Sequence, residues 1–121
     1  MKSVLFISHG SHSPDTETEV RAYVRQLKSL SDVGIMEYAF LEIAHPTIPE
    51  GIDICINKGA TEVVVLLNFL NAGKHVDEDI PRIVNEARAK HPEINFHITK
   101  PIGQHDQIIH LFLDLINKSG Q

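Results

Sequence analysis

The sequence predicts an α/β domain, a four-stranded parallel sheet with helices on both faces. Short apolar runs alternate with longer amphipathic runs along the whole chain, which is the pattern of βα units in a parallel sheet. The 121 residues contain no internal repeat, low-complexity segment or Ser/Gly-rich linker. We therefore expect one compact unit of structure, a single domain over residues 1–121.

The first half of the chain predicts two strands and two helices. Ser3–Ile7 is a short apolar run, typical of a strand buried on both faces. A helix is expected to begin at Ser13, a good cap that proline follows, with an inner stripe of Val20, Tyr23, Val24, Leu27 and Leu30. We then expect a strand over Ile35–Ile43 and a helix over Pro46–Lys58 that ends at Gly59.

The second half repeats this alternation. Thr61–Leu67 is a continuous β-branched run and predicts the clearest strand. We expect a helix from about Asp77 to Lys90, a strand over Ile94–Ile98 and a last helix over His105–Asn117, with an inner stripe of Ile108, Ile109, Phe112, Leu115 and Ile116. Right-handed crossovers favour the strand order 2-1-3-4. The order then reverses between strands one and three, where open sheets of this kind bind ligands.

Composition excludes several classes of function. Eleven basic against sixteen acidic residues give a net charge of −5, which argues against nucleic acid as a partner because phosphate binding needs a basic surface. The longest apolar run is far shorter than the ~20 residues that cross a bilayer, so we expect no membrane contact. Cys55 is the one cysteine, which indicates a reducing compartment and a cytoplasmic protein.

Three polar side chains follow the ends of neighbouring strands. His9 follows the first strand, Glu42 closes the second, and His75 lies in the loop after the third. Because neighbouring strands are ~4.8 Å apart, these side chains can meet over one crevice. Two imidazoles and a carboxylate can hold a divalent ion or move protons. The alternative is that each is an ordinary residue at a loop end.

The turn Ser8-His9-Gly10-Ser11 between the first strand and helix allows a second interpretation. Gly10 permits close backbone approach, and the amides of the helix that follows favour an anion. A phosphohistidine nucleophile is a further alternative, but it requires an arginine beside the histidine. The first arginine of the chain is Arg21, which argues against this alternative.

Several motifs together resemble the small class II chelatases. The turn after the first strand is similar to the family's HGS opening, and Phe40-Leu41-Glu42 with Pro46-Thr47-Ile48 is similar to its FLE and PT element. Asn68–His75 with Asp79-Ile80-Pro81 resembles its FL, G, H and DIP element, and Pro101-Ile102-Gly103 matches a further turn. Since the motifs fall in order over the whole chain, it resembles the short sirohydrochlorin chelatases of the CbiX type, a group that includes SirB-like ferrochelatases and nickel-inserting members.

The resemblance implies an enzyme that inserts Co²⁺, Fe²⁺ or Ni²⁺ into sirohydrochlorin, a carboxylate-rich tetrapyrrole. It assigns metal handling to His9 and His75 and an acidic helper role to Glu42. The ion is a substrate, and no permanent cofactor is expected. Long members carry two such lobes, and a chain of this length is similar to the homodimeric short members, with the macrocycle in the cleft between lobes.

A carboxylate-rich ring also needs groups on the protein that bind its carboxylates. Gly10 and Ser11 at the first turn, with Asn71 and Lys74 in the loop before His75, are the candidates for this contact. The alternative is that these residues are ordinary solvated ones. Many relatives carry arginine after the HGS turn, where this chain has His12, so one expected cation is missing. Two alternatives stay open: a tetrapyrrole or metal carrier without turnover, and a single lobe that needs a different partner.

Overall fold

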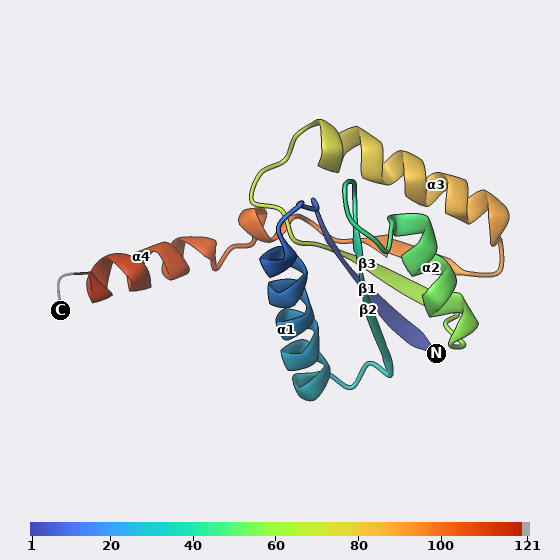
Figure 1. Cartoon of the computed structure of the whole chain (residues 1–121), viewed down its shortest axis with the longest axis horizontal. Helices are drawn as coiled ribbons and strands as arrows, with labels where there is room; N and C mark the ends of the chain where they lie inside the picture. Colours follow the sequence, from blue (N-terminus) through green and yellow to red (C-terminus); the bar gives the residue numbers. More distant parts are fainter. Residues whose placement is uncertain (120–121) are drawn as a thin grey trace.

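The computed structural model describes residues 1–119 and contains one parallel sheet (Figure 1). Its four strands are β1 (Lys2–Ser8), β2 (Ile35–Phe40), β3 (Glu62–Leu67) and β4 (Asn95–Ile98). They pair in the order β2-β1-β3-β4, all parallel. The predicted order 2-1-3-4 is confirmed, and the reversal lies between β1 and β3.

The helices are α1 (Pro14–Leu30), α2 (Ile48–Asn57), α3 (Ile80–Lys90) and α4 (Ile108–Lys118), with a π-helical turn η1 (His75–Asp79) and a 3₁₀ turn η2 (Ile102–Gln104). Both faces of the sheet are covered by helices, as predicted, but α4 does not take part. In Figure 1, α1 lies on one side of the sheet and α2 and α3 lie on the other, while α4 projects away from the sheet. Among residues 1–119 no helix combines the length and the hydropathy that a bilayer crossing needs.

Two apolar cores hold the layers together. The larger core, on the side of α2 and α3, contains Leu5, Ile7, Val63, Val65 and Val84, none of them exposed to solvent. The smaller core lies on the side of α1 and contains Val4, Phe6, Val20, Val24, Met36 and Phe40. Alternate residues of β1 thus serve opposite faces, as the pleat of a strand requires.

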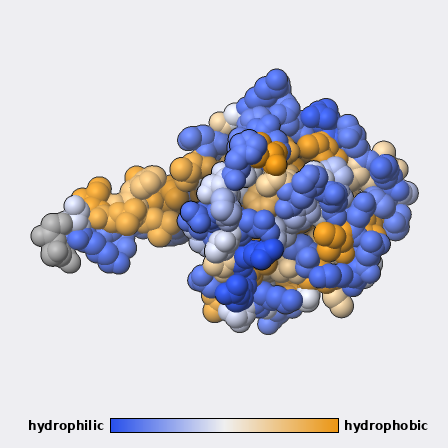
Figure 2. Space-filling view, viewed as in Figure 1, coloured by the Kyte–Doolittle hydropathy of each residue, from blue (hydrophilic) through white to orange (hydrophobic). Residues whose placement is uncertain are grey.

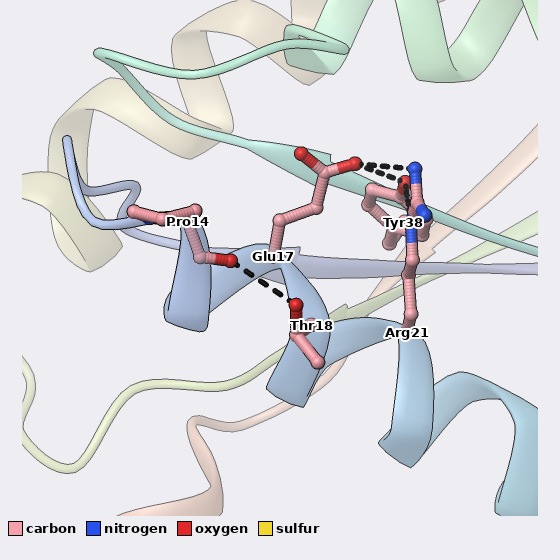
Figure 3. Close-up of polar contacts among 5 residues, drawn as sticks. All are labelled: Pro14, Glu17, Thr18, Arg21 and Tyr38. Atoms are coloured by element: carbon pink, nitrogen blue, oxygen red, sulfur yellow. Dashed lines mark hydrogen bonds and ion pairs between the residues drawn. The ribbon is translucent and has the colours of Figure 1, made fainter.

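A polar contact joins α1 to the edge strand β2 (Figure 3). Glu17 Oε1 accepts hydrogen bonds from Arg21 Nη2 at 2.7 Å and from the Tyr38 hydroxyl at 3.0 Å. Arg21 Nε donates to the same hydroxyl at 3.0 Å, and this bond raises the pKa of Arg21. In the first turn of α1, the Thr18 hydroxyl donates to Pro14 O. The contact fixes α1 over the β1–β2 half of the sheet.

Capping residues set where the helices begin. Ser13 caps α1, as predicted, and its side chain accepts from the Asp15 amide. Thr47 caps α2 in a capping box, in which Thr47 and Glu50 each accept from the other's backbone N–H. Accepting the Thr47 amide, and then the contact with His45, lowers the pKa of Glu50 to about 2.

Two predicted boundaries were wrong in ways that matter for the site. The second strand ends at Phe40 and not at Ile43, because the chain bends away after Phe40 and turns at Ile43, whose φ is 74°. His75 is not a loop residue but the first residue of η1. The Asp77 amide donates to Gly73 O at 2.7 Å, so the helical winding begins before the predicted start at Asp77.

The predicted inner stripes of the first and last helices were partly wrong. In α1, Val20 and Val24 are buried, but Tyr23 is 50% and Leu30 86% exposed, because Leu30 is the last residue of the helix. In α4 no residue is buried, although Ile109, Phe112, Leu115 and Ile116 were predicted to face the core. The helical spacing is right, but α4 packs on neither face of its own sheet (Figure 1).

Candidate metal centre

The loops after β1 and β2 are bonded to each other at the carboxyl edge of the sheet. The Leu41 amide donates to Ser8 O at 2.9 Å, and the Glu42 amide donates to His9 O at 3.0 Å. Gly10 has a φ of 111°, and a Cβ at this position would lie 1.8 Å from Glu42 O. Only glycine fits here, so Gly10 permits the close approach that brings His9 beside Glu42.

A tight turn then aims the Glu42 side chain. The Ala44 amide donates to Glu42 O at 2.8 Å across Ile43, which with the positive φ of Ile43 makes a γ-turn. A β-branched residue in this region is strained. Next to this turn, Glu42 Oε1 lies 2.7 Å from His9 Nε2.

His75 reaches the same place from the other side of the reversal point. β1 and β3 are neighbours, and the Asn68 amide group after β3 donates to the Ser8 hydroxyl at 3.0 Å. In η1, His75 Nδ1 lies 2.8 Å from Asp79 Oδ2. When Nδ1 carries the proton and donates to Asp79, the Nε2 lone pair is free for a metal ion.

The structure brings the three predicted side chains together. One ligand atom from each of His9, Glu42 and His75 lies within 4.8 Å of the other two, and the two imidazole centroids are 5.2 Å apart with an interplanar angle of 53°. The side chains of His9, Glu42 and His75 are 46%, 49% and 45% exposed. The arrangement is a three-ligand site open to solvent, which suits an ion that must enter and leave.

Among residues 1–119, no side-chain hydrogen bond joins Ser11, Asn71 or Lys74 to this cluster. The Ser11 hydroxyl accepts from the Ser13 amide at 3.0 Å. Asn71 and Lys74 are exposed, and Lys74 immediately precedes η1. His45, which also lies near Glu42 in the sequence, contacts Glu50 at 2.7 Å. The roles of Gly10, Ser11, Asn71 and Lys74 in substrate binding remain predictions.

Asp79 is a functional candidate that the sequence reasoning did not include among the site residues. Its carboxylate contacts His75 through one oxygen and lies 3.8 Å from Arg82 Nη2 through the other. The spacing of His75 and Asp79 was a usable signal, since residues four apart in a helical segment lie on the same side of it. It was hidden because His75 was expected in a loop, where this spacing carries no information.

Comparison with known proteins places this geometry in a family. The CbiX family model matches residues 3–119. The chain belongs to the CbiX family. This confirms the resemblance read from its motifs.

Named members of the CbiX family support this assignment. The chain is 38% identical over its whole length to a sirohydrochlorin cobaltochelatase of Priestia megaterium, of which it covers 39%. It is 30% identical, over 99% of its length, to a sirohydrochlorin ferrochelatase of the same organism, of which it covers 45%. The crystal structure of the sirohydrochlorin chelatase SirB from Bacillus subtilis subspecies spizizenii in complex with cobalt matches 98% of the chain with a TM-score of 0.88 and 27% identity, and the match covers 50% of SirB. The chain therefore spans half or less of the length of these relatives.

Proposed function

We propose that this CbiX chain inserts a divalent metal ion into sirohydrochlorin. The observation that carries the proposal is the open cluster of His9, Glu42 and His75 at the carboxyl edge of the sheet. Relatives named as sirohydrochlorin cobaltochelatase and ferrochelatase support the substrate and favour Co²⁺ or Fe²⁺ as the ion. Ni²⁺ is the third candidate, since imidazole ligands suit all three ions.

The first step is capture of the ion. Neutral His9 and His75 offer nitrogen ligands, and water completes the coordination shell. When His75 Nδ1 donates to the carboxylate of Asp79, Nε2 carries no proton, which makes the imidazole a better ligand. Because only three protein groups surround the ion and all are half-exposed, the ion can pass on to the ring.

The second step removes two pyrrole protons as the ion enters the ring. Each metal–nitrogen bond to a pyrrole replaces an N–H bond, so two protons leave for each ion inserted. His9 Nε2 and Glu42 Oε1 are in contact, so the imidazole and the carboxylate can together accept one of these protons. A base in this position accelerates proton transfer by typically ~10²–10⁴-fold, and solvent takes the protons from the exposed pair.

The ring is expected to lie against this edge between two copies of the chain. Half the length of the relatives corresponds to one lobe, and a homodimer supplies the second. In this proposal Ser11, Asn71 and Lys74 bind ring carboxylates, and Gly10 leaves the backbone of the first turn open to approach. We also place the chain in the cytoplasm, which its single, unpaired cysteine supports.

The decisive experiment measures turnover. Sirohydrochlorin is mixed under anaerobic conditions with Co²⁺, Fe²⁺ or Ni²⁺ and substoichiometric protein, and metallation is followed by absorption. An enzyme metallates many rings per chain. A carrier binds one ring or ion per chain and leaves the rate unchanged, and this result would overturn the proposal.

A further inference from the structure

α4 exposes the largest set of apolar side chains on the molecule. Ile109, Leu111, Phe112, Leu113, Leu115 and Ile116 are each 48–66% exposed. In Figure 2 the projecting helix is hydrophobic along most of its visible surface, with a hydrophilic strip along one edge. Phe112 exposes about half of the ~200 Å² of an aromatic ring, and five aliphatic side chains of the same helix are exposed to a similar fraction, so the exposed apolar area of the helix is several hundred Å². That is at the upper limit for a monomer surface and typical of an interface.

The sheet has an uncovered half on the side of α1, which we call the open face. It consists of Val64 and Leu66 of β3 with Asn95 and His97 of β4, and Val64 pairs with His97 in register. Val64 and Leu66 pack against the α1 core only at their edge and are half-buried. The wound α/β pattern provides a helix after β4 to cover this half, and α4 is that helix by sequence.

The linker directs α4 away from its own open face. A Cβ on Gly103 would lie 1.6 Å from Leu70 O, and the Gly103 amide donates to Phe69 O at 3.0 Å, so η2 is fixed to the loop after β3. Residues 105–107, which follow η2, are also held by hydrogen bonds. His105 donates its amide to Ile102 O and accepts the Ile108 amide, and its Nδ1 accepts the Gln107 amide.

The match with the SirB structure extends over α4. It covers 98% of this chain, which leaves only about two residues unmatched. SirB is twice as long as the match, so its chain contains a second half of similar length beside the part that matches α1 to α4.

We propose that α4 is exchanged between two copies of this chain. The apolar side of each α4 packs on the open face of the partner copy, and an apolar groove that includes Leu66, Pro101 and Ile102 extends that face toward the linker. Exchange buries two helices in one dimer, and each copy contributes both a helix and a face. Because each copy contributes a helix and a face, the buried area is of the order of the ~800 Å² per partner of a standard interface, and exchange of an identical element is a low-cost route to a dimer.

The inference specifies the dimer of the proposed function, and its test measures mass, so it can fail while metal insertion stands. The full chain is compared by light scattering with Phe112→Asp at the centre of the apolar side of α4. The matched control is His110→Asp, on the polar side of the same helix. We expect a wild-type dimer, a dimer constant weakened at least tenfold in Phe112→Asp, and no change in the control.

A second pair of variants tests the open face. Val64→Asp places a charge under the exchanged helix, and Asn95→Arg does so at a position that is already exposed, so its fold is not at risk. Circular dichroism checks that each variant is folded. Each is expected to weaken the dimer at least tenfold by itself.

Mixing the two kinds of variant separates exchange from its alternatives. A Phe112→Asp chain keeps an intact open face, and an Asn95→Arg chain keeps an intact α4, so an equimolar mixture restores one of the two contacts. We expect a mixed dimer that is tighter than either variant alone. A monomeric wild type would overturn the proposal. So would normal dimers of Val64→Asp and Asn95→Arg, which would mean that α4 pairs with α4, or a mixture that stays monomeric.

Discussion

At the scale of single residues, each imidazole of the cluster is paired with its own carboxylate. Glu42 contacts His9 and Asp79 contacts His75, at 2.7 and 2.8 Å. The two carboxylates differ in their position relative to the ion site. Among the described residues, Glu42 belongs to the group of three that could hold an ion, and Asp79 does not. We infer that Glu42 acts on the ion or its protons and that Asp79 acts on His75.

Replacing either imidazole tests the cluster itself. His9→Ala and His75→Ala are each expected to lower the rate of metallation by at least ~100-fold, because each removes a ligand or base from a three-group site. The side chains are half-exposed, so the melting temperature should change little. The matched control is His110→Ala on α4. Wild-type turnover in either site variant would contradict the assignment.

Asp79 is tested as a positioning residue. Asp79→Ala frees the His75 ring to rotate, and loss of such a partner typically weakens metal affinity ~10–100-fold. Asp79→Asn keeps an oxygen that accepts from Nδ1, so it should retain most of the affinity. Calorimetric titration with Co²⁺ measures both variants, with Asp77→Ala on the same turn as the control. A purely structural role would lower the melting temperature of Asp79→Ala and leave its Co²⁺ affinity unchanged.

At the scale of the elements, the features that follow from the alternation of apolar and polar residues could be predicted from the sequence. The strand order, the helix caps at Ser13 and the meeting of His9, Glu42 and His75 follow from alternation and from the rule for parallel sheets. The γ-turn at Ile43 was not predictable, because no residue type signals a strained turn. The position of α4 was missed for a different reason: an amphipathic stripe shows that a helix packs on something, but not that the surface belongs to the same chain.

The capping box of α2 makes one element sensitive to acid. The bond from the Thr47 amide lowers the pKa of Glu50 to about 2 from 4.5. A lowered pKa stabilises the fold above the unfolded value, and this contribution is lost as pH falls through the folded value. We expect the melting temperature of wild type to exceed that of Glu50→Gln at pH 6 and the difference to disappear between about pH 4.5 and 2. Glu19→Gln, at an exposed position of α1, should show no such trend. A constant difference down to pH 2 would contradict this role of the carboxylate.

At the scale of the whole molecule, the question is how a planar ring is covered at the edge of the sheet. The cluster lies at an open edge, and the two chelatases of Priestia megaterium and SirB are each about twice as long as the chain or longer. A flat ring bound at that edge has protein on one side only. A second copy would cover the other side and exclude water from the reacting nitrogens, which strengthens the electrostatic interactions within the site.

This architecture predicts that turnover depends on protein concentration while ion binding does not. Metallation per chain should fall when the protein is diluted below its dimer constant, because the enclosure is lost. Co²⁺ binding should persist, because His9, Glu42 and His75 come from one copy. Phe112→Asp should shift the concentration of half-maximal metallation upward at least tenfold, equivalent to ~1.4 kcal/mol of association, and His110→Asp should not. The contradicting result is a turnover per chain that stays constant at concentrations where light scattering shows only monomer. The ring would then be metallated at an edge that no second lobe covers, and one copy would suffice.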